Sequence, residues 1–127
     1  MPIDESLIVA HVDEAAFGRL VAAFYRRVQE DDLIGPMYPP DDWAGAEARL
    51  AGFLCFRFHG NPAYIESRGH PRLRGRHLPF QIGEAERDRW MALMGAAMAE
   101  TEIAAEALGP LRAFFAQVAD FMRNQAH

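Results

Sequence analysis

The run RGHPRLRGRHLPF, at residues 68–80, brings together side chains that are able to do chemistry. Arginine side chains bind anionic groups through charge-assisted hydrogen bonds, so the run predicts a site for a small anion. His77 lies next to Leu78 and close to Phe80 and Ile82. An imidazole held among apolar residues is able to ligate a metal ion. The alternative is an exposed loop histidine, because histidines often lie at protein surfaces.

The charge and composition of the chain exclude several classes of protein. The net charge is −5 and the pI is about 5.5, whereas nucleic-acid binding typically requires a basic surface. Cys55 is the only cysteine, so no internal disulfide forms and a reducing compartment is the simplest context. The first residues carry acids where a secretory signal carries bases, and no apolar run approaches the roughly 20 residues that span a bilayer. We expect a single domain over residues 1–127, located in the cytoplasm, with neither nucleic acid nor membrane as a partner.

Apolar residues at spacings of three and four predict four long helices. The first follows an Asp13 cap, and the second covers residues 43–58 behind Asp42. The third contains Trp90, and Pro110 suits the first turn of the fourth. No segment shows the alternation that is typical of strands. The fold class is therefore predicted to be all-α.

Residues 60–83, between the second and third helices, contain too many glycines and prolines for a long regular element. An irregular stretch of this length in a compact domain is usually either functional or disordered. Apolar residues spread through it favour packing against another group. They are Tyr64, Ile65, Leu73, Leu78, Phe80 and Ile82. Helices with wide apolar faces can enclose a flat hydrophobic cofactor, and this stretch is expected to form one wall.

Four segments together carry a resemblance to a known family. They are FYRRV at 24–28, MYPPDDWAGAEARLAGFL at 37–54, RGHPRLRGRHLPFQI at 68–82 and ERDRW at 86–90. In this combination the chain resembles the truncated haemoglobins of the second group over nearly its whole length. The resemblance implies a globin-like, two-over-two helical sandwich around haem b, with His77 as the proximal iron ligand. A neutral imidazole in that position leaves the opposite face of the iron open for dioxygen.

The resemblance also implies the residues around the haem. It places five on the side where the gas binds: Tyr25, Tyr38, Ala46, Leu50 and Trp90. The phenols and the indole are able to donate hydrogen bonds to bound dioxygen, which carries partial negative charge, whereas Ala46 donates nothing. Core packing alone is the alternative for these three aromatic residues.

The remaining expected haem contacts are of two kinds. Arg49 and Arg74 are expected to bind the haem propionates, with a solvated surface arginine as the alternative for each. The apolar contacts are expected to be Phe53, Leu54, Phe80, Ile82 and Met94.

The chain departs from the family at His59, which replaces the first glycine of the pair that usually follows the second helix. Left-handed backbone geometry is costly for histidine, so a different turn is expected there. His59 also lies four residues after Cys55, on one helical face. A zinc or copper pair is conceivable, but structural zinc normally takes four protein ligands, and only two are visible.

Three functions remain open at this stage. The first is a haem protein with a pentacoordinate iron that binds dioxygen reversibly and uses it in redox chemistry, namely nitric oxide dioxygenation or peroxide reduction. This function requires an external electron donor. The second is storage, transport, delivery or sensing of dioxygen without turnover. The third is a helical interaction module with no cofactor. A homodimer is compatible with each of them.

Overall fold

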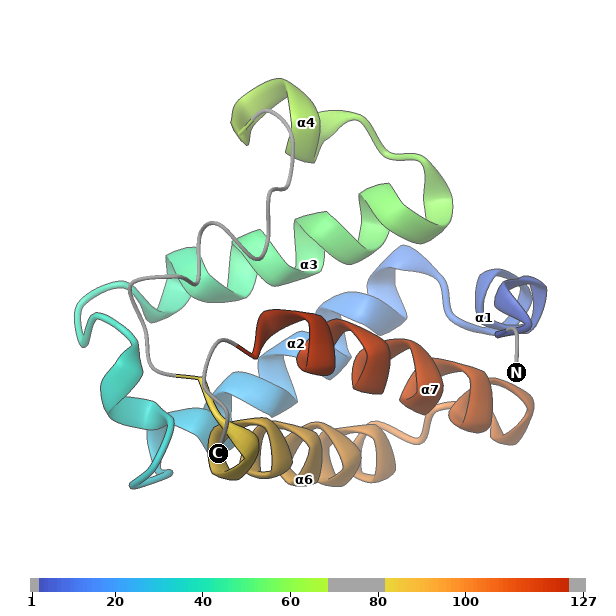
Figure 1. Cartoon of the computed structure of the whole chain (residues 1–127). Helices are drawn as coiled ribbons and strands as arrows, with labels where there is room; N and C mark the ends of the chain where they lie inside the picture. The colour runs from blue at the N-terminus through green and yellow to red at the C-terminus, as the bar shows by residue number, and fades with distance from the viewer. Residues whose placement is uncertain (1–2, 69–81, 124–127) are drawn as a thin grey trace.

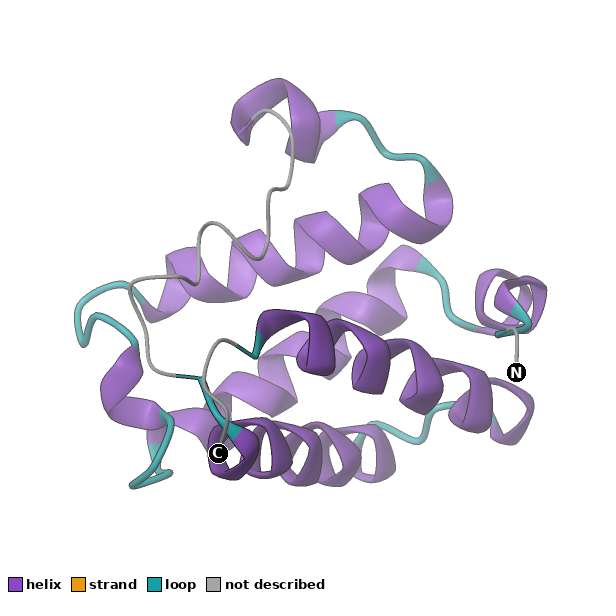
Figure 2. Ribbon diagram, viewed as in Figure 1, coloured by secondary structure: helices purple, strands orange, loops and turns teal. Residues whose placement is uncertain are grey.

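The computed structural model describes residues 3–68 and 82–123, and within these residues every regular element is helical (Figure 2). The elements are α1 Glu5–His11, α2 Glu14–Gln29, the short 3-10 helix η1 Gly35–Met37, α3 Trp43–His59, α4 Ala63–Arg68, α6 Glu84–Glu100 and α7 Ala105–Met122. The predicted all-α class is confirmed. None of the described helices is long and apolar enough to cross a membrane.

The helices form two packed pairs (Figure 1). Helix α2 contacts both α3 and α6, and α6 contacts α7, so that α2 and α3 form one layer and α6 and α7 the other. Helix α1 contacts α7 and α3, and α4 packs against α3. This arrangement is the two-over-two sandwich that the resemblance implies.

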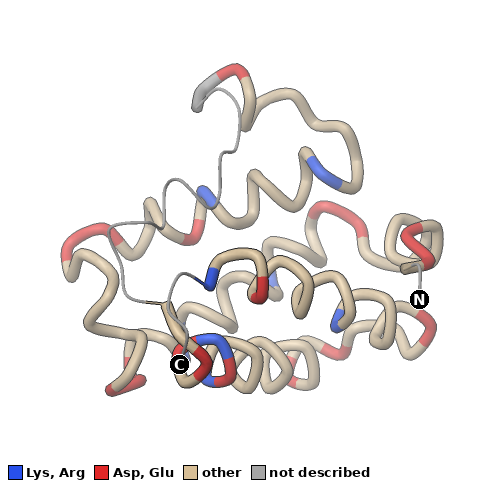
Figure 3. Tube along the Cα trace, in the orientation of Figure 1, with Lys and Arg blue, Asp and Glu red and all other residues tan. Residues whose placement is uncertain are grey.

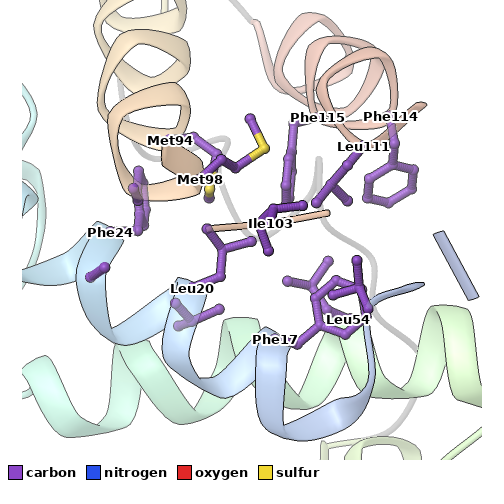
Figure 4. Packing of buried hydrophobic residues seen from close by; sticks show 14 of the residues in the cluster. Phe17, Leu20, Phe24, Leu54, Met94, Met98, Ile103, Leu111, Phe114 and Phe115 are labelled. Carbon is purple, nitrogen blue, oxygen red and sulfur yellow. The ribbon is translucent and has the colours of Figure 1, made fainter. Parts of the chain in front are cut away.

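Helix α2 forms the centre of the core. Its start is fixed by Asp13, whose Oδ1 accepts a hydrogen bond from the Ala16 amide at 2.8 Å. Phe17, Leu20 and Phe24 follow at helical spacing and are 0% exposed. They meet residues from α3, α6 and α7, as Figure 4 shows. Each such burial contributes about 1.5–3 kcal/mol, so α2 holds the two layers together.

Helix α3 ends in a left-handed turn that needs only one glycine. Gly60 has φ +67°, and its amide donates to the Phe56 carbonyl at 3.0 Å, while the Asn61 amide donates to the Cys55 carbonyl at 3.3 Å. His59 remains the last helical residue. The cost that histidine would carry in the left-handed region is avoided because Gly60 occupies that region instead.

Two features of the helices differ from the sequence prediction. The prediction that Pro110 lies in the first turn of the last helix is wrong, because α7 begins at Ala105 and contains Pro110 in its interior. Ala107 and Leu111, on either side of the proline, are 0% exposed, and their packing stabilises the extra turn despite the missing amide. The short elements α1, η1 and α4 were not predicted. Helix α1 lies against α7, and its Ile8 is fully buried.

Candidate functional site

A cavity of about 490 Å³ lies among α2, α3, α6 and α7, within the size range of small-ligand and cofactor sites. Most of its wall is apolar. The lining residues are Tyr25, Ile34, Met37, Tyr38, Pro39, Ala46, Arg49, Leu50, Phe53, Tyr64, Ile82, Glu86, Arg87, Trp90, Val118, Ala119 and Met122. A cavity with this wall suits a largely apolar group that carries a few polar or charged atoms.

Tyr25, Tyr38 and Trp90 form a hydrogen-bonded cluster on the cavity wall. The Tyr38 hydroxyl oxygen accepts hydrogen bonds from the Tyr25 hydroxyl and the Trp90 indole N–H. A hydroxyl has one proton and two lone pairs, so these two bonds use its acceptor capacity. Because Tyr38 lines the cavity, its own O–H is able to donate to an acceptor there.

The position of each ring in this cluster follows from the helices. Tyr25 comes from α2 and is 6% exposed, Trp90 comes from α6, and Tyr38 directly follows η1. Phe24 packs between the two helices, with ring centroids 4.9 Å from Tyr25 and 5.1 Å from Trp90. The packing of α2 on α6 thus sets the distance between the two donors that bind Tyr38.

Both phenols stay protonated at neutral pH. Burial raises the pKa of Tyr25 well above its usual value, and the neighbouring Tyr38 raises it further. Burial also raises the pKa of Tyr38, although the hydrogen bonds from Tyr25 and Trp90 and the charge of Arg49 act in the opposite direction. The cluster is therefore neutral and able to donate hydrogen bonds to a partly negative ligand.

Two arginines on the cavity wall reach solvent and carry the positive charge of the site. Arg49 Nη1 lies 3.0 Å from Asp42 Oδ2, and the Arg49 side chain is 34% exposed. This contact explains why Asp42 makes no side-chain hydrogen bond that caps α3. Arg87 Nε lies 2.7 Å from Asp120 Oδ1, on α7. Partly exposed guanidinium groups at the cavity rim are suited to bind carboxylates of a ligand.

The structure brings most of the predicted site residues to this cavity. Those on its wall are Tyr25, Tyr38, Ala46, Arg49, Leu50, Phe53, Ile82 and Trp90. Leu54 and Met94 are fully buried in the core instead, and they do not line the cavity (Figure 4). His77, Arg74 and Phe80 lie outside the described residues, so their predicted roles remain predictions.

Sequence reasoning missed several residues of the cavity wall. Arg87 lies three residues before Trp90, and Glu86 lies four before it, so both share its helical face. That spacing would have identified them. Met122 also lines the cavity, although it is distant in sequence from the predicted cluster, and only the packing of α7 reveals its role. Tyr64, from the stretch that was expected to form one wall, lines the cavity as well.

None of the histidines in the described part of the chain lines the cavity. His11 is exposed at the end of α1. His59 Nε2 lies 2.6 Å from the Val12 carbonyl oxygen, a contact that ties the end of α3 to the end of α1. Among the described residues no cluster of three or more histidine, cysteine or acidic side chains is able to hold a metal ion.

Comparison with known proteins gives a family match over most of the chain. The model of the bacterial-like globins matches residues 12–124. Group 2 truncated hemoglobin YjbI of Bacillus subtilis is 39% identical over 87 residues, which are 68% of this chain and 65% of that protein. The aligned region thus spans slightly less than two thirds of that relative.

Solved structures agree with the described fold. A thermostable hemoglobin from Thermobifida fusca superposes with a TM-score of 0.85 at 41% identity, covering 90% of this chain and 93% of that one. Hemoglobin from Chloroflexus aurantiacus gives a TM-score of 0.85 at 38% identity, covering 98% of this chain and 100% of that one. The similarity therefore extends to the helices that form the cavity.

Proposed function

The chain belongs to the bacterial-like globin family, and on that premise we propose that it holds haem b in the cavity and uses it to bind dioxygen for a redox reaction. The single observation that carries this proposal is the cavity itself, where a hydrogen-bonding aromatic cluster shares a mostly apolar wall with two arginines. We also propose that residues 1–127 act as one truncated-globin domain in the cytoplasm.

The residues of the cavity fit a haem in three respects. The flat apolar ring system matches walls made by residues such as Leu50, Phe53 and Met122. The two propionates match the partly exposed guanidinium groups of Arg49 and Arg87. The open coordination position needs a neutral donor nearby, and the Tyr38 O–H, with its acceptor capacity already used, is such a donor.

We propose His77 as the proximal ligand. The described histidines, His11 and His59, do not line the cavity, and His59 is bound to the Val12 carbonyl. His77 lies five residues before Ile82, which is buried and lines the cavity. This position and the family resemblance both favour His77 over the other histidines beyond the described ranges.

The chain's own residues then determine how dioxygen is held. When bound, haem supplies an open iron position and one-electron chemistry. Tyr38 donates a hydrogen bond into the cavity, and Tyr25 and Trp90 fix the orientation of its hydroxyl. Ala46 lines the same cavity with only a methyl group, so the wall at this position leaves room for a second small molecule.

This arrangement favours reaction over delivery. A donor whose geometry is fixed by two hydrogen bonds slows the loss of a partly negative ligand, whereas delivery requires easy release. Nitric oxide and peroxide are small enough to enter beside Ala46. We therefore propose nitric oxide dioxygenation or peroxide reduction, with dioxygen and other small gases as ligands and an external electron donor as a partner.

Rapid mixing tests the proposal. The purified protein is expected to show the absorption spectrum of a haem protein and to release dioxygen slowly. The oxygenated form is expected to consume nitric oxide at roughly 10⁷ M⁻¹s⁻¹ or faster, near the diffusional ceiling. Fast dioxygen release together with slow reactions toward nitric oxide and peroxide would instead assign storage, delivery or sensing.

A further inference from the structure

Three oxidisable aromatic side chains form a continuous set of ring contacts from the cavity toward the surface. The ring centroids of Tyr25 and Tyr38 are 5.5 Å apart, and those of Tyr38 and Trp43 are 5.4 Å apart. Tyr25 and Trp43 are also in direct contact, at 6.4 Å. All three distances lie within the range of contacting aromatic pairs.

Trp43 is the outer end of this set. Tyr25 and Tyr38 line the cavity, whereas Trp43 does not. Trp43 is the first residue of α3 and is half-buried, so part of its indole reaches solvent. Ligand binding in the cavity makes no use of it. A leucine would cover the two tyrosines equally well, but an indole can also lose one electron to a strong oxidant.

The surface around Trp43 is acidic. Asp41 is exposed, Asp42 adjoins Trp43, and Glu47 lies one turn further along α3 on the same face. Figure 3 shows acidic positions in red where the chain enters α3. Arg49 offsets the charge of Asp42 through their ion pair, so that among the described residues Asp41 and Glu47 carry the remaining charge near Trp43. Negative charge at this position favours the approach of neutral or cationic molecules over anionic ones.

We propose that Trp43 is a surface oxidation site for phenolic one-electron donors of neutral or positive charge, and that Tyr38 and Tyr25 connect it electronically to the cavity. The inference rests on the proposed reaction with peroxide and names the donor class for it. Donors too large to enter the cavity are oxidised at Trp43, without contact with the haem.

The reaction balances with peroxide as the oxidant. The O–O bond of one hydrogen peroxide breaks in the cavity, two electrons and two protons are taken up, and two water molecules form. Each electron passes inward from Trp43 through the tyrosines. One phenol replaces it, loses its O–H proton to solvent and leaves as a phenoxyl radical, so that two phenols are consumed for each peroxide.

This route is specific for peroxide. Indole and phenol rings give up electrons only to strong oxidants, and peroxide is the strong oxidant among the proposed substrates. The electron that nitric oxide dioxygenation would require could not come from Trp43, because no oxidant as strong as peroxide takes part in that reaction. That step uses a separate electron donor, so changes at Trp43 leave it unaffected.

The test uses a phenol attached to a large soluble polymer, such as tyramine coupled to dextran, which is excluded from the cavity. The haem-loaded wild type is expected to oxidise it with peroxide, and Trp43→Phe is expected to lower kcat/KM by about tenfold or more. A matched control restores an exposed indole elsewhere. Val9 is 45% exposed on α1, at the opposite end of the molecule from the start of α3 (Figure 1). The Trp43→Phe/Val9→Trp double variant is expected to stay as slow as Trp43→Phe.

A second readout does not depend on turnover. After a peroxide pulse without donor, a nitroso spin trap followed by peptide mass spectrometry is expected to find the adduct on Trp43 in the wild type, and on Tyr25 or Tyr38 in Trp43→Phe. The proposal would be overturned if Trp43→Phe, with the haem content and melting temperature of the wild type, oxidised the tethered phenol at the wild-type rate. An adduct confined to the tyrosines in the wild type would overturn it as well.

The charge of the site is tested separately with two small phenols. Tyramine is cationic and 4-hydroxyphenylacetate is anionic, so at low salt tyramine is expected to react several-fold faster. Asp41→Asn is expected to reduce this preference more than Glu106→Gln, which removes one exposed charge at the start of α7. Equal reduction by both variants would contradict a docking role for the acidic surface.

Failure of the proposed function is recognised independently. A wild type without haem, or with haem that does not consume peroxide, refutes the proposed function and the inference together. A haem-loaded wild type that consumes peroxide, but oxidises the polymer-linked phenol no faster than Trp43→Phe does, refutes the inference alone.

Discussion

Replacing Tyr38 by phenylalanine tests the arrangement of the aromatic cluster. The Tyr38 oxygen accepts from Tyr25 and Trp90, and this leaves its own O–H as the donor into the cavity. Tyr38→Phe removes that donor and keeps the ring contacts with Tyr25 and Trp43. The variant therefore changes the hydrogen bond to the ligand with little change in packing.

The size of the effect follows from the kind of bond that is lost. A hydrogen bond to a charged acceptor contributes about 1.5–3 kcal/mol, and bound dioxygen carries only partial charge, so about 1.5 kcal/mol is appropriate. Since 1.4 kcal/mol corresponds to a factor of ten, dioxygen should leave Tyr38→Phe roughly ten times faster. Tyr25→Phe removes only one bond that orients Tyr38, worth about 0.5–1 kcal/mol, and should speed release roughly two- to fivefold.

Stopped-flow dissociation of dioxygen, with carbon monoxide as the replacing ligand, measures these rates. Haem content and melting temperature serve as controls for each variant. A release rate from Tyr38→Phe equal to that of the wild type would refute the assignment of Tyr38 as the donor. A larger effect of Tyr25→Phe than of Tyr38→Phe would reverse the order of the hydrogen bonds in the cluster.

Three further predictions concern the rim of the cavity, the cysteine and alkaline pH. Arg49→Ala should speed haem transfer to apomyoglobin roughly two- to fivefold, as expected for the loss of a partly exposed ion pair between Arg49 and a propionate. Asp42→Asn should leave the transfer rate unchanged. An unchanged rate in Arg49→Ala would exclude Arg49 as a propionate partner. Burial, together with Glu14, raises the pKa of Cys55 to about 11. At pH 8 the Cys55 thiol should therefore react with a disulfide reagent at least roughly tenfold slower in the folded protein than in the unfolded protein. Equal rates in the two states would contradict this expectation. The raised pKa values of Tyr25 and Tyr38 keep both phenols neutral in the folded state, whereas the same phenols ionise near pH 10 in the unfolded chain. The free energy of unfolding in urea should therefore be level from about pH 7 to 9 and fall above pH 10. The fall should be less steep in the Tyr25→Phe/Tyr38→Phe double variant.

The helices could be predicted from the sequence because their signals are local. Asp13 and the apolar spacing after it define α2, and residues 43–58 fall within α3. The start of α7 could not be predicted in this way. Pro110 is a strong local signal for a first turn, but burial of Ala107 and Leu111 outweighs it, and that burial depends on tertiary packing.

The candidate site shows the same division between local and tertiary information. Residues on the cavity face of one helix, such as Ala46, Leu50 and Phe53, follow from periodicity and family resemblance. Leu54 adjoins Phe53 in sequence but faces the core, so a contact list drawn from neighbours alone includes it. The order of donors around Tyr38 depends on how α2 packs on α6, which no sequence pattern records.

The central claim is that this chain holds haem through His77, and haem content of paired histidine variants tests it most directly. Each variant is expressed and loaded with haem under the same conditions as the wild type. His59→Ala is the matched control, because its ring binds the Val12 carbonyl and does not line the cavity. His77→Ala is expected to lose most of its haem and the five-coordinate ferrous spectrum, while His59→Ala retains both. Full haem content and an unchanged ferrous spectrum in His77→Ala would contradict the claim.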